Sequence, residues 1–315
     1  MKLNRSQTHL IKGLAIIMVI ASHFRKVYDL PETVQNLLNP CGYLGVGLFL
    51  MVSGYGCAVS CSENCFGTFV KRVSRLIVPL TSATVITVLI QIILKITPPS
   101  PLLIIFQCIG LNHQICSAAW YISLQYLCWF SFLFLGNQYS MIKILIWGFC
   151  LSFVILMFSI WVDVDGLFLD LWGLNAFSFV AGVIMSMYNI GKKTLIVSLS
   201  LFVTLFIFCY FLMGNPTDLL LRNPLKSLIA VLFVIMVFSL TMLLPIKNVP
   251  HIFLLVGQNA YYIYLAHVFF AFCFGKFVLG LSFSEAFVIF AFVTLLGSFV
   301  LKRIDDKLRQ LKWMK

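Results

Sequence analysis

The chain has 315 residues, of which 61% are hydrophobic and only 10% are charged, with a net charge of +12. Roughly a quarter of the residues of a water-soluble domain are charged, so this composition excludes a soluble globular protein. The positive charge does not indicate nucleic acid as a partner, because the basic residues adjoin long apolar runs, where membrane topology and anionic lipid account for them. The composition therefore predicts an all-α, polytopic membrane protein, since a helix satisfies every backbone N–H and C=O within the lipid.

Ten apolar runs follow one another along the chain, each close to the length of about 20 residues that spans a bilayer. They cover residues 9–27, 41–61, 75–96, 115–135, 141–161, 167–189, 194–213, 225–246, 252–273 and 283–301. No connection between them is long enough to fold alone. We therefore expect one ten-helix membrane domain over residues 1–301, followed by a basic cytoplasmic tail over residues 302–315 that resembles a short amphipathic helix on the inner leaflet.

The positions of the basic residues predict the orientation of these spans. With ten spans and both termini in the cytoplasm, 16 of the 22 Lys and Arg residues fall on the cytoplasmic side. Cytoplasmic loops of membrane proteins carry this excess. The first run continues past Ala21 without a small-x-small cleavage site, which favours a retained helix over a signal peptide.

The ten cysteines are scattered through apolar segments, where cysteine behaves as a small hydrophobic residue. Cys57, Cys61 and Cys65 recur every four residues and would share one helix face, but only Glu63 accompanies them, so we expect no metal site. Two further cysteines, Cys108 and Cys116, flank a predicted outer loop and could form a disulfide in an oxidising compartment.

Ionisable groups within membrane spans are costly and are therefore candidates for function. Lys12 and His23 lie eleven residues apart in the first run, which is about three helical turns, so they project from nearly the same face about 16 Å apart along the axis. A cation at the inner mouth and a proton-transfer group deeper in would suit an anionic donor that enters from the cytoplasm. Alternatively, Lys12 extends to the inner headgroups and His23 caps a helix end near water.

Small residues recur through the second run, at Gly45, Gly47, Ser53, Gly54 and Gly56. They would let another helix or an acyl chain approach the backbone closely, and plain helix packing is the commoner explanation.

Two arginines precede the third run. Arg72 and Arg75 are three residues apart and share a helix face, with Lys71 beside them. Their guanidinium groups could bind phosphates in a bidentate manner, or they could anchor the helix at the cytoplasmic surface.

Polar residues also interrupt two later runs. The fourth run carries Trp120 and Gln125 in a segment with several polar side chains, and these polar groups cannot all face lipid. In the ninth run, Tyr261, Tyr264 and His267 follow at spacings of three along one face. Tyrosines near a membrane interface are common anchors, but this role explains His267 less well.

The order of these motifs resembles the acyltransferase-3 family of membrane acyltransferases, which includes bacterial enzymes that O-acetylate surface polysaccharides and antibiotic precursors. The family's first helix carries a basic residue, ten intervening residues and a histidine, as at Lys12 and His23. Its other motifs have counterparts in the Ser-Gly segment Leu48–Tyr55, the Arg-x-x-Arg pair Arg72 and Arg75, the Trp-led segment at Trp120, and the segment Ala260–His267.

Two positions depart from the family pattern. Lys12 stands where the family usually has arginine; lysine keeps the charge but lacks the guanidinium fork. Gln125 stands where the Trp-led segment often has glutamate, and an amide cannot act as a base.

The resemblance implies acyl transfer, typically from acetyl-CoA on the cytoplasmic side to a hydroxyl of a sugar, a surface polysaccharide or a lipid-linked glycan. No resident cofactor is expected, and acetyl-CoA would be a co-substrate. His23 would be the general base or would relay the acyl group. Lys12, Arg72 and Arg75 would bind the donor's phosphates, whereas the acceptor side or channel would be lined by Ser53, Trp120, Gln125, Tyr261, Tyr264 and His267.

The family also implies a bacterial inner-membrane location. Two other classes of function stay open: a transporter or flippase, although no internal repeat is visible, and a non-catalytic scaffold of the same ancestry, which the two departures allow. The sequence does not specify the acceptor, the length of the acyl chain or the oligomeric state.

Overall fold

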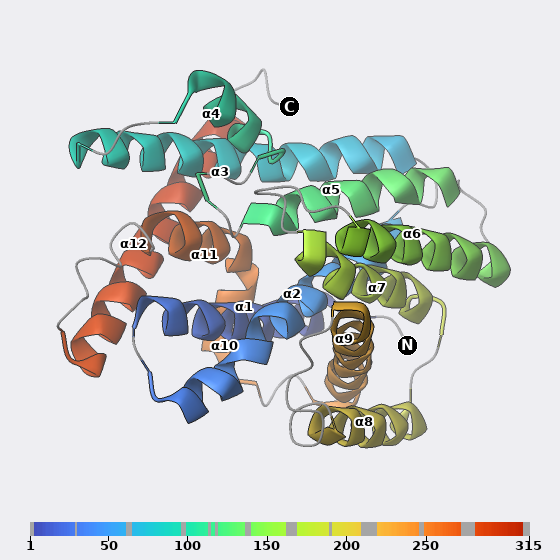
Figure 1. Ribbon diagram of the computed structural model, residues 1–315. Helices are drawn as coiled ribbons and strands as arrows, with labels where there is room; N and C mark the ends of the chain where they lie inside the picture. Colours follow the sequence, from blue (N-terminus) through green and yellow to red (C-terminus); the bar gives the residue numbers. More distant parts are fainter. Residues whose placement is uncertain are drawn as a thin grey trace. The chain divides into compact units, whose positions relative to one another are not determined.

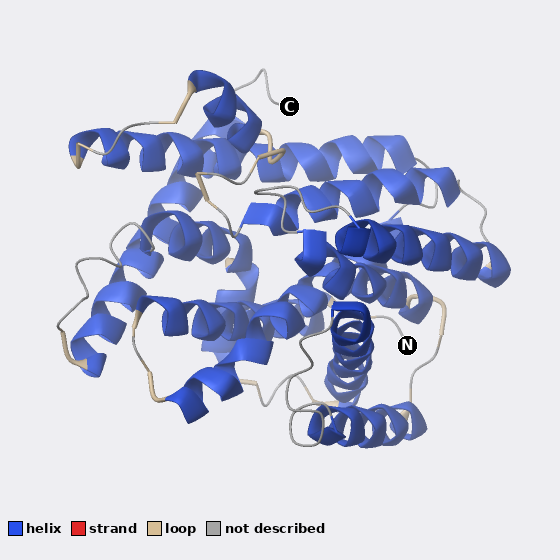
Figure 2. Ribbon diagram, in the orientation of Figure 1, coloured by secondary structure: helices blue, strands red, loops and turns tan. Residues whose placement is uncertain are grey.

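The structure is a computed structural model that describes residues 3–28, 30–60, 65–95, 99–112, 115–116, 119–135, 140–161, 169–188, 191–208, 219–245, 249–271 and 281–310. Every regular element within these residues is a helix (Figure 1, Figure 2). The helices are α1 (Arg5–Val27), α2 (Glu32–Ser60), α3 (Cys65–Ile93), α4 (Pro101–Cys108), α5 (Trp120–Phe132) with η2 (Leu133–Leu135), α6 (Met141–Trp161), α7 (Leu169–Met185), α8 (Lys192–Ile207), α9 (Leu219–Leu243), α10 (His251–Gln258), α11 (Ala260–Ala266), η5 (His267–Ala271) and α12 (Phe283–Gln310).

Each of the ten predicted apolar runs contains a helix or a pair of helices, which confirms the all-helical membrane fold. Among the described residues, six helices are long and apolar enough to cross a membrane, and a seventh is added if α10 and α11 with η5 count as one broken span. Two shorter apolar helices lie at Trp120–Leu135 and Leu171–Met185. The total of ten spans and the cytoplasmic position of both termini stay predictions.

The structure differs from the sequence-based expectation in two places. Helix α4 was not predicted; it begins because Ser100 caps it and Pro101 occupies its first turn, where a missing N–H costs nothing. Helix α12 runs without a break from Phe283 to Gln310, so residues 302–310 continue the last apolar helix instead of starting a separate one. The rest of the predicted tail lies outside the described residues.

The described residues cover only part of the predicted cysteine face. Cys57 lies in α2, which ends at Ser60, whereas Cys65 begins α3. Cys61 and Glu63 lie outside the described residues. Cys108 and Cys116, the pair left open by the sequence, are not joined by a disulfide.

The chain divides into two compact units, and some helices have residues in both of them. Unit 1 comprises Met1–Val19, Tyr43–Phe69 and Leu124–Gln258, and unit 2 comprises Ile20–Gly42, Val70–Ser123 and Asn259–Lys315. Helices α1, α2, α3 and α5 each contribute residues to both units. A single membrane domain over residues 1–301 stays a prediction.

In unit 1, α7 packs against α6 and α9, and α8 packs against α9. One core cluster of unit 1 joins Ile11 and Ala15 of α1 to Leu48 and Met51 of α2 and to Phe238 of α9. The burial of these apolar side chains holds four helices together, since Ala181 and Met185 of α7 belong to the same cluster.

The small residues predicted in the second run allow α2 and α7 to cross at close range. A Cβ atom added at Gly54 would lie 2.1 Å from the carbonyl oxygen of Phe179, and one added at Gly182 would lie 2.0 Å from that of Met51. Neither contact tolerates a side chain, so helix packing explains these glycines.

In unit 2, α11 and η5 pack against α12. Phe24 of α1 is buried against Ala286 and Phe290 of α12, and its ring meets those of Phe283 and Phe287 edge-on. This packing fixes the second half of α1, including His23, against the helices that follow residue 259.

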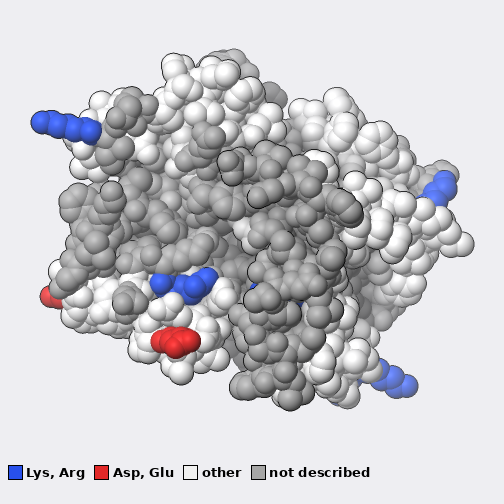
Figure 3. Space-filling model, viewed as in Figure 1, with Lys and Arg blue, Asp and Glu red and all other residues white. Residues whose placement is uncertain are grey.

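The exposed side chains of several helices are large and apolar, as a lipid-facing surface requires. On α6 they include Ile142, Ile146 and Phe149, and on α12 they include Phe292 and Leu295. On the face shown in Figure 3, the charged side chains of the described residues are few and isolated. In water such surfaces would be costly, whereas in a bilayer they are not.

Candidate active site

Two histidines that are far apart in the sequence meet in unit 2. Nδ1 of His23 on α1 lies 2.9 Å from Nε2 of His267, and the two rings are stacked with their centroids 5.1 Å apart. His267 is fully buried and His23 is half-buried. The structure thus brings together two residues that the sequence predicted separately.

The second nitrogen of His267 decides how this pair shares its hydrogens. Nδ1 of His267 lies 3.1 Å from the carbonyl oxygen of Ile263, and because a carbonyl only accepts, Nδ1 must carry the hydrogen. Among the described residues no carboxylate pairs with this buried ring, so we assign it as neutral, since an unpaired buried charge is costly. Nε2 of His267 then accepts from Nδ1–H of His23, which leaves the lone pair of a neutral His23 on Nε2.

One face of α11 and η5 carries side chains that contact the histidine pair and α3. Tyr261, Tyr264 and His267 lie on that face, as predicted, and six residues of helix correspond to about 9 Å along the axis. The hydroxyl of Tyr261 donates to the carbonyl of Leu76 on α3 over 2.9 Å. Tyr264, whose ring is buried, lies edge-on to His267 with centroids 5.5 Å apart.

Tyr264 also contacts a tyrosine that the sequence analysis did not single out. The ring of Tyr121 on α5 meets the ring of Tyr264 with centroids 5.5 Å apart. Tyr121 is half-buried, and its neighbour Trp120 is buried at the first residue of α5. Aromatic rings therefore continue from the histidine pair to α5 within unit 2.

His267 begins a segment of π-helix, His267–Ala271. Such wide turns are rare and are frequently found at functional sites. Here the segment packs against α12.

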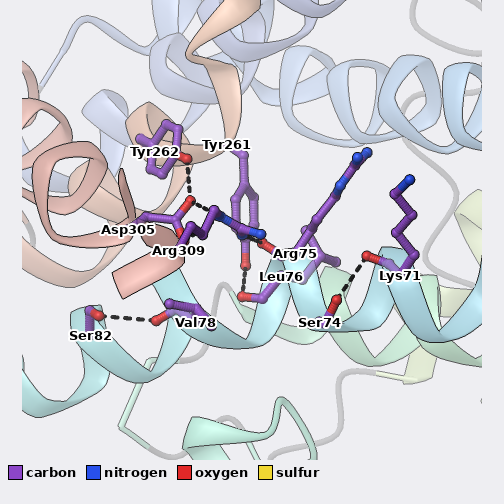
Figure 4. Close-up of polar contacts among 10 residues, drawn as sticks. All are labelled: Lys71, Ser74, Arg75, Leu76, Val78, Ser82, Tyr261, Tyr262, Asp305 and Arg309. Atoms are coloured by element: carbon purple, nitrogen blue, oxygen red, sulfur yellow. Dashed lines mark hydrogen bonds and ion pairs between the residues drawn. The ribbon is translucent and has the colours of Figure 1, made fainter. Parts of the chain in front are cut away.

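The predicted phosphate-binding arginines lie in the first half of α3, in the part of the helix that belongs to unit 2. Arg75 and Lys71 are exposed, whereas Arg72 is half-buried. Figure 4 shows the side chains of Lys71 and Arg75 extending in the same direction from one face of α3. An exposed pair of cations one helical turn apart suits an anionic group.

The end of α12 lies against this part of α3. Asp305 is buried and accepts from the hydroxyl of Tyr262 over 2.6 Å. Nε of Arg309 lies 2.8 Å from Oδ1 of the same carboxylate, and Nη2 of Arg309 donates to the carbonyl of Arg75 over 3.3 Å. The end of α12 therefore contacts α3 at Arg75 within unit 2.

Three predicted residues belong to unit 1 instead. Ser53 on α2 accepts two hydrogen bonds, from Nε2 of Gln125 over 2.6 Å and from Nε1 of Trp129 over 2.7 Å. The structure thus joins Ser53 and Gln125, and adds Trp129, which was not predicted. Lys12 is half-buried on the part of α1 that belongs to unit 1.

No group of three or more metal-ligating side chains gathers within the described ranges of the chain. In unit 2, the described side chains suit proton transfer at His23 and anion binding at Lys71, Arg72 and Arg75.

A protein-family profile described as an acyltransferase domain matches residues 7–303. The chain belongs to the acyltransferase-3 family. As a member of that family it is a membrane acyltransferase. Comparisons with curated proteins and with solved structures gave no match.

The acyltransferase-3 match spans every residue that the sequence predicted for the site. It ends just before Asp305 and Arg309, which were missed along with Tyr121, Tyr262 and Trp129. Their side chains act through contacts with distant helices, so a linear motif gives no signal for them.

Proposed function

We propose that this acyltransferase-3 protein transfers an acyl group, of the size of acetyl, from acyl-CoA to a hydroxyl of a sugar, a surface polysaccharide or a lipid-linked glycan. The observation that carries the proposal is the hydrogen bond between His23 and His267, because it leaves the basic nitrogen of His23, Nε2, as a proton acceptor. A general base aimed at a hydroxyl is the requirement of acyl transfer to an alcohol.

In this mechanism, Nε2 of His23 removes the proton of the acceptor hydroxyl as its oxygen attacks the carbonyl carbon of the thioester. The C–S bond then breaks, and the imidazolium returns the proton to the departing sulfur, which gives the ester and free CoA. His267 accepts the Nδ1–H bond of His23 throughout, which holds the ring in one tautomer and stabilises the positive charge that it transiently carries.

Arg72 and Arg75, which both belong to unit 2, hold the phosphates of the donor. CoA is too large and too charged to cross a bilayer, so the donor enters from the cytoplasm, where the excess of basic residues is predicted. Trp120, Tyr261 and Tyr264, also in unit 2, line the acceptor side. The family's bacterial inner-membrane location supports an acceptor that belongs to the cell surface.

Binding and turnover of acetyl-CoA by the purified full-length protein in detergent test this proposal. Calorimetry should show saturable binding of acetyl-CoA, which the double substitution Arg72→Ala, Arg75→Ala abolishes. His23→Ala should bind acetyl-CoA as the intact protein does but release no CoA in the presence of an acceptor extract.

The matched control removes two exposed cations from elsewhere, by Lys143→Ala with Lys193→Ala. It has the same net charge as the arginine double variant and should bind acetyl-CoA normally. A folded intact protein that does not bind acetyl-CoA, or a His23→Ala variant with full turnover, would contradict the proposal.

A further inference from the structure

Helix α3 carries a proline directly after its predicted phosphate-binding turn. Pro79 lies inside the helix and is buried. In an α-helix the N–H of residue 79 would donate to the carbonyl of residue 75, but proline has no N–H, and its ring crowds that carbonyl. The sequence of α3 therefore leaves the carbonyl of Arg75 without its helical partner.

The missing donor comes from α12. Nη2 of Arg309 donates to the Arg75 carbonyl over 3.3 Å, across 234 residues of sequence. Next to it, the hydroxyl of Tyr261 donates to the carbonyl of Leu76 over 2.9 Å. Two side chains from other helices thus bind successive carbonyls in the turn before Pro79 (Figure 4).

Arg309 is itself held in place by a buried acid. Its Nε lies 2.8 Å and 2.9 Å from the two carboxylate oxygens of Asp305, which also accepts from Tyr262 over 2.6 Å. A buried carboxylate needs such partners, because an unpaired buried charge is costly. The charge of Arg309 is therefore largely balanced by Asp305, and its main contribution to α3 is the hydrogen bond to the backbone.

We infer that Arg309, held by Asp305 and Tyr262, is a positioning residue for a diphosphate-binding site whose ligating side chains are Lys71 and Arg75. Pro79 frees the carbonyl of Arg75, Arg309 binds it, and the fixed turn presents the two exposed cations side by side. The ligand is the diphosphate of the acyl-CoA donor, so the inference rests on the proposed function. It assigns a role to Lys71 and Arg309, neither of which the family motifs include.

Substitution of Pro79 distinguishes a positioning role of Arg309 from a direct effect of its charge on acetyl-CoA binding. Pro79→Ala restores the N–H that the Arg75 carbonyl lacks, and so makes the donor from Arg309 redundant. We expect Arg309→Ala to weaken acetyl-CoA binding about tenfold in the natural background, the factor expected for one lost hydrogen bond, and less than about twofold in the Pro79→Ala background. Lys71→Ala should weaken binding in both backgrounds.

The measurement is calorimetric titration of acetyl-CoA into full-length protein in nanodiscs of neutral phosphatidylcholine, with fluorescence-detected size exclusion to show that each variant is folded. Lys307→Ala is the control, since Lys307 is an exposed cation two residues from Arg309 on α12; it should bind normally. If Arg309→Ala fails to fold, Arg309→Lys, which keeps the charge but cannot make both contacts, replaces it with the same expected contrast.

Four results would overturn the inference. An equal loss of affinity in both backgrounds would mean that Arg309 acts by its charge, and an unchanged affinity would mean that it does not act at all. An effect seen only in nanodiscs that contain anionic phosphatidylglycerol would assign the cations to lipid headgroups. Absence of acetyl-CoA binding by the folded natural protein would overturn the proposed function as well, whereas the other three leave it standing.

Discussion

Nδ1 of His23 and Nε2 of His267 lie 2.9 Å apart, and the carbonyl of Ile263, 3.1 Å from the other nitrogen of His267, determines which of the two rings donates. Nδ1–H of His267 donates to the backbone carbonyl of Ile263, and Nε2 of His267 accepts from Nδ1–H of His23. Because the two roles use different ring nitrogens, two amide substitutions can separate them.

We predict that His267→Gln retains more acyl transfer than His267→Asn. The amide of glutamine reaches the position of Nε2 and can accept from Nδ1–H of His23, whereas the amide of asparagine reaches only the position of Nδ1 and can donate to Ile263. With asparagine, kcat should fall by about a hundredfold or more, the lower end of a general-base contribution, while the affinity for acetyl-CoA stays unchanged. Single-turnover CoA release and calorimetry measure the two quantities.

The opposite order would show that His267 serves the backbone carbonyl of Ile263 on α11 and not His23. His251→Asn, at the exposed first residue of α10, is the control for a general effect of replacing a histidine. It should leave both kcat and binding unchanged.

The sequence predicted the helices well because apolar length is a local property: every predicted run contains a helix. It also predicted His23 and His267 as individual residues. It did not predict that they meet, because 244 residues separate them and helical spacing relates only residues of the same helix, such as Lys12 and His23.

The same reason explains why Arg309 was missed. The sequence placed it in a basic tail, where a lysine- and arginine-rich segment suggests contact with anionic lipid. The structure continues α12 through that segment and buries Asp305. Pro79 was the one sequence signal for a partner, since a proline inside a helix leaves a carbonyl that some other donor must bind.

A second prediction concerns the glycine contact between α2 and α7. Gly54→Ala or Gly182→Ala should lower the free energy of unfolding by about 1–3 kcal/mol, because the added Cβ would lie about 2 Å from a backbone carbonyl and the helices must separate. Thermal denaturation in detergent, followed by tryptophan fluorescence, measures the change. Gly191→Ala is the matched control, since nothing lies within 4 Å of its added Cβ; a similar loss there would contradict the packing explanation.

A third prediction concerns Ser53, which accepts hydrogen bonds from Gln125 and Trp129. Ser53→Ala removes an acceptor from two buried donors, and we expect a loss of about 1–3 kcal/mol of stability. Ser60→Ala, at the exposed end of α2, should change stability by less than about 0.5 kcal/mol. Equal melting temperatures for the two variants would show that the Ser53 contacts contribute nothing.

The last prediction tests whether Lys12, which stands where the family usually has arginine, binds a phosphate of the donor as the resemblance implies. Lys12→Arg restores a planar guanidinium that can bind a phosphate through two parallel hydrogen bonds, so acetyl-CoA should bind at least as tightly to this variant as to the natural protein. Lys12→Ala should weaken binding by about tenfold or more, because a charge-assisted contact is lost. Calorimetry in neutral nanodiscs measures both, with Lys193→Ala as the control for a loss of one exposed cation. If Lys12→Ala binds as tightly as that control, Lys12 only anchors α1 at the headgroups.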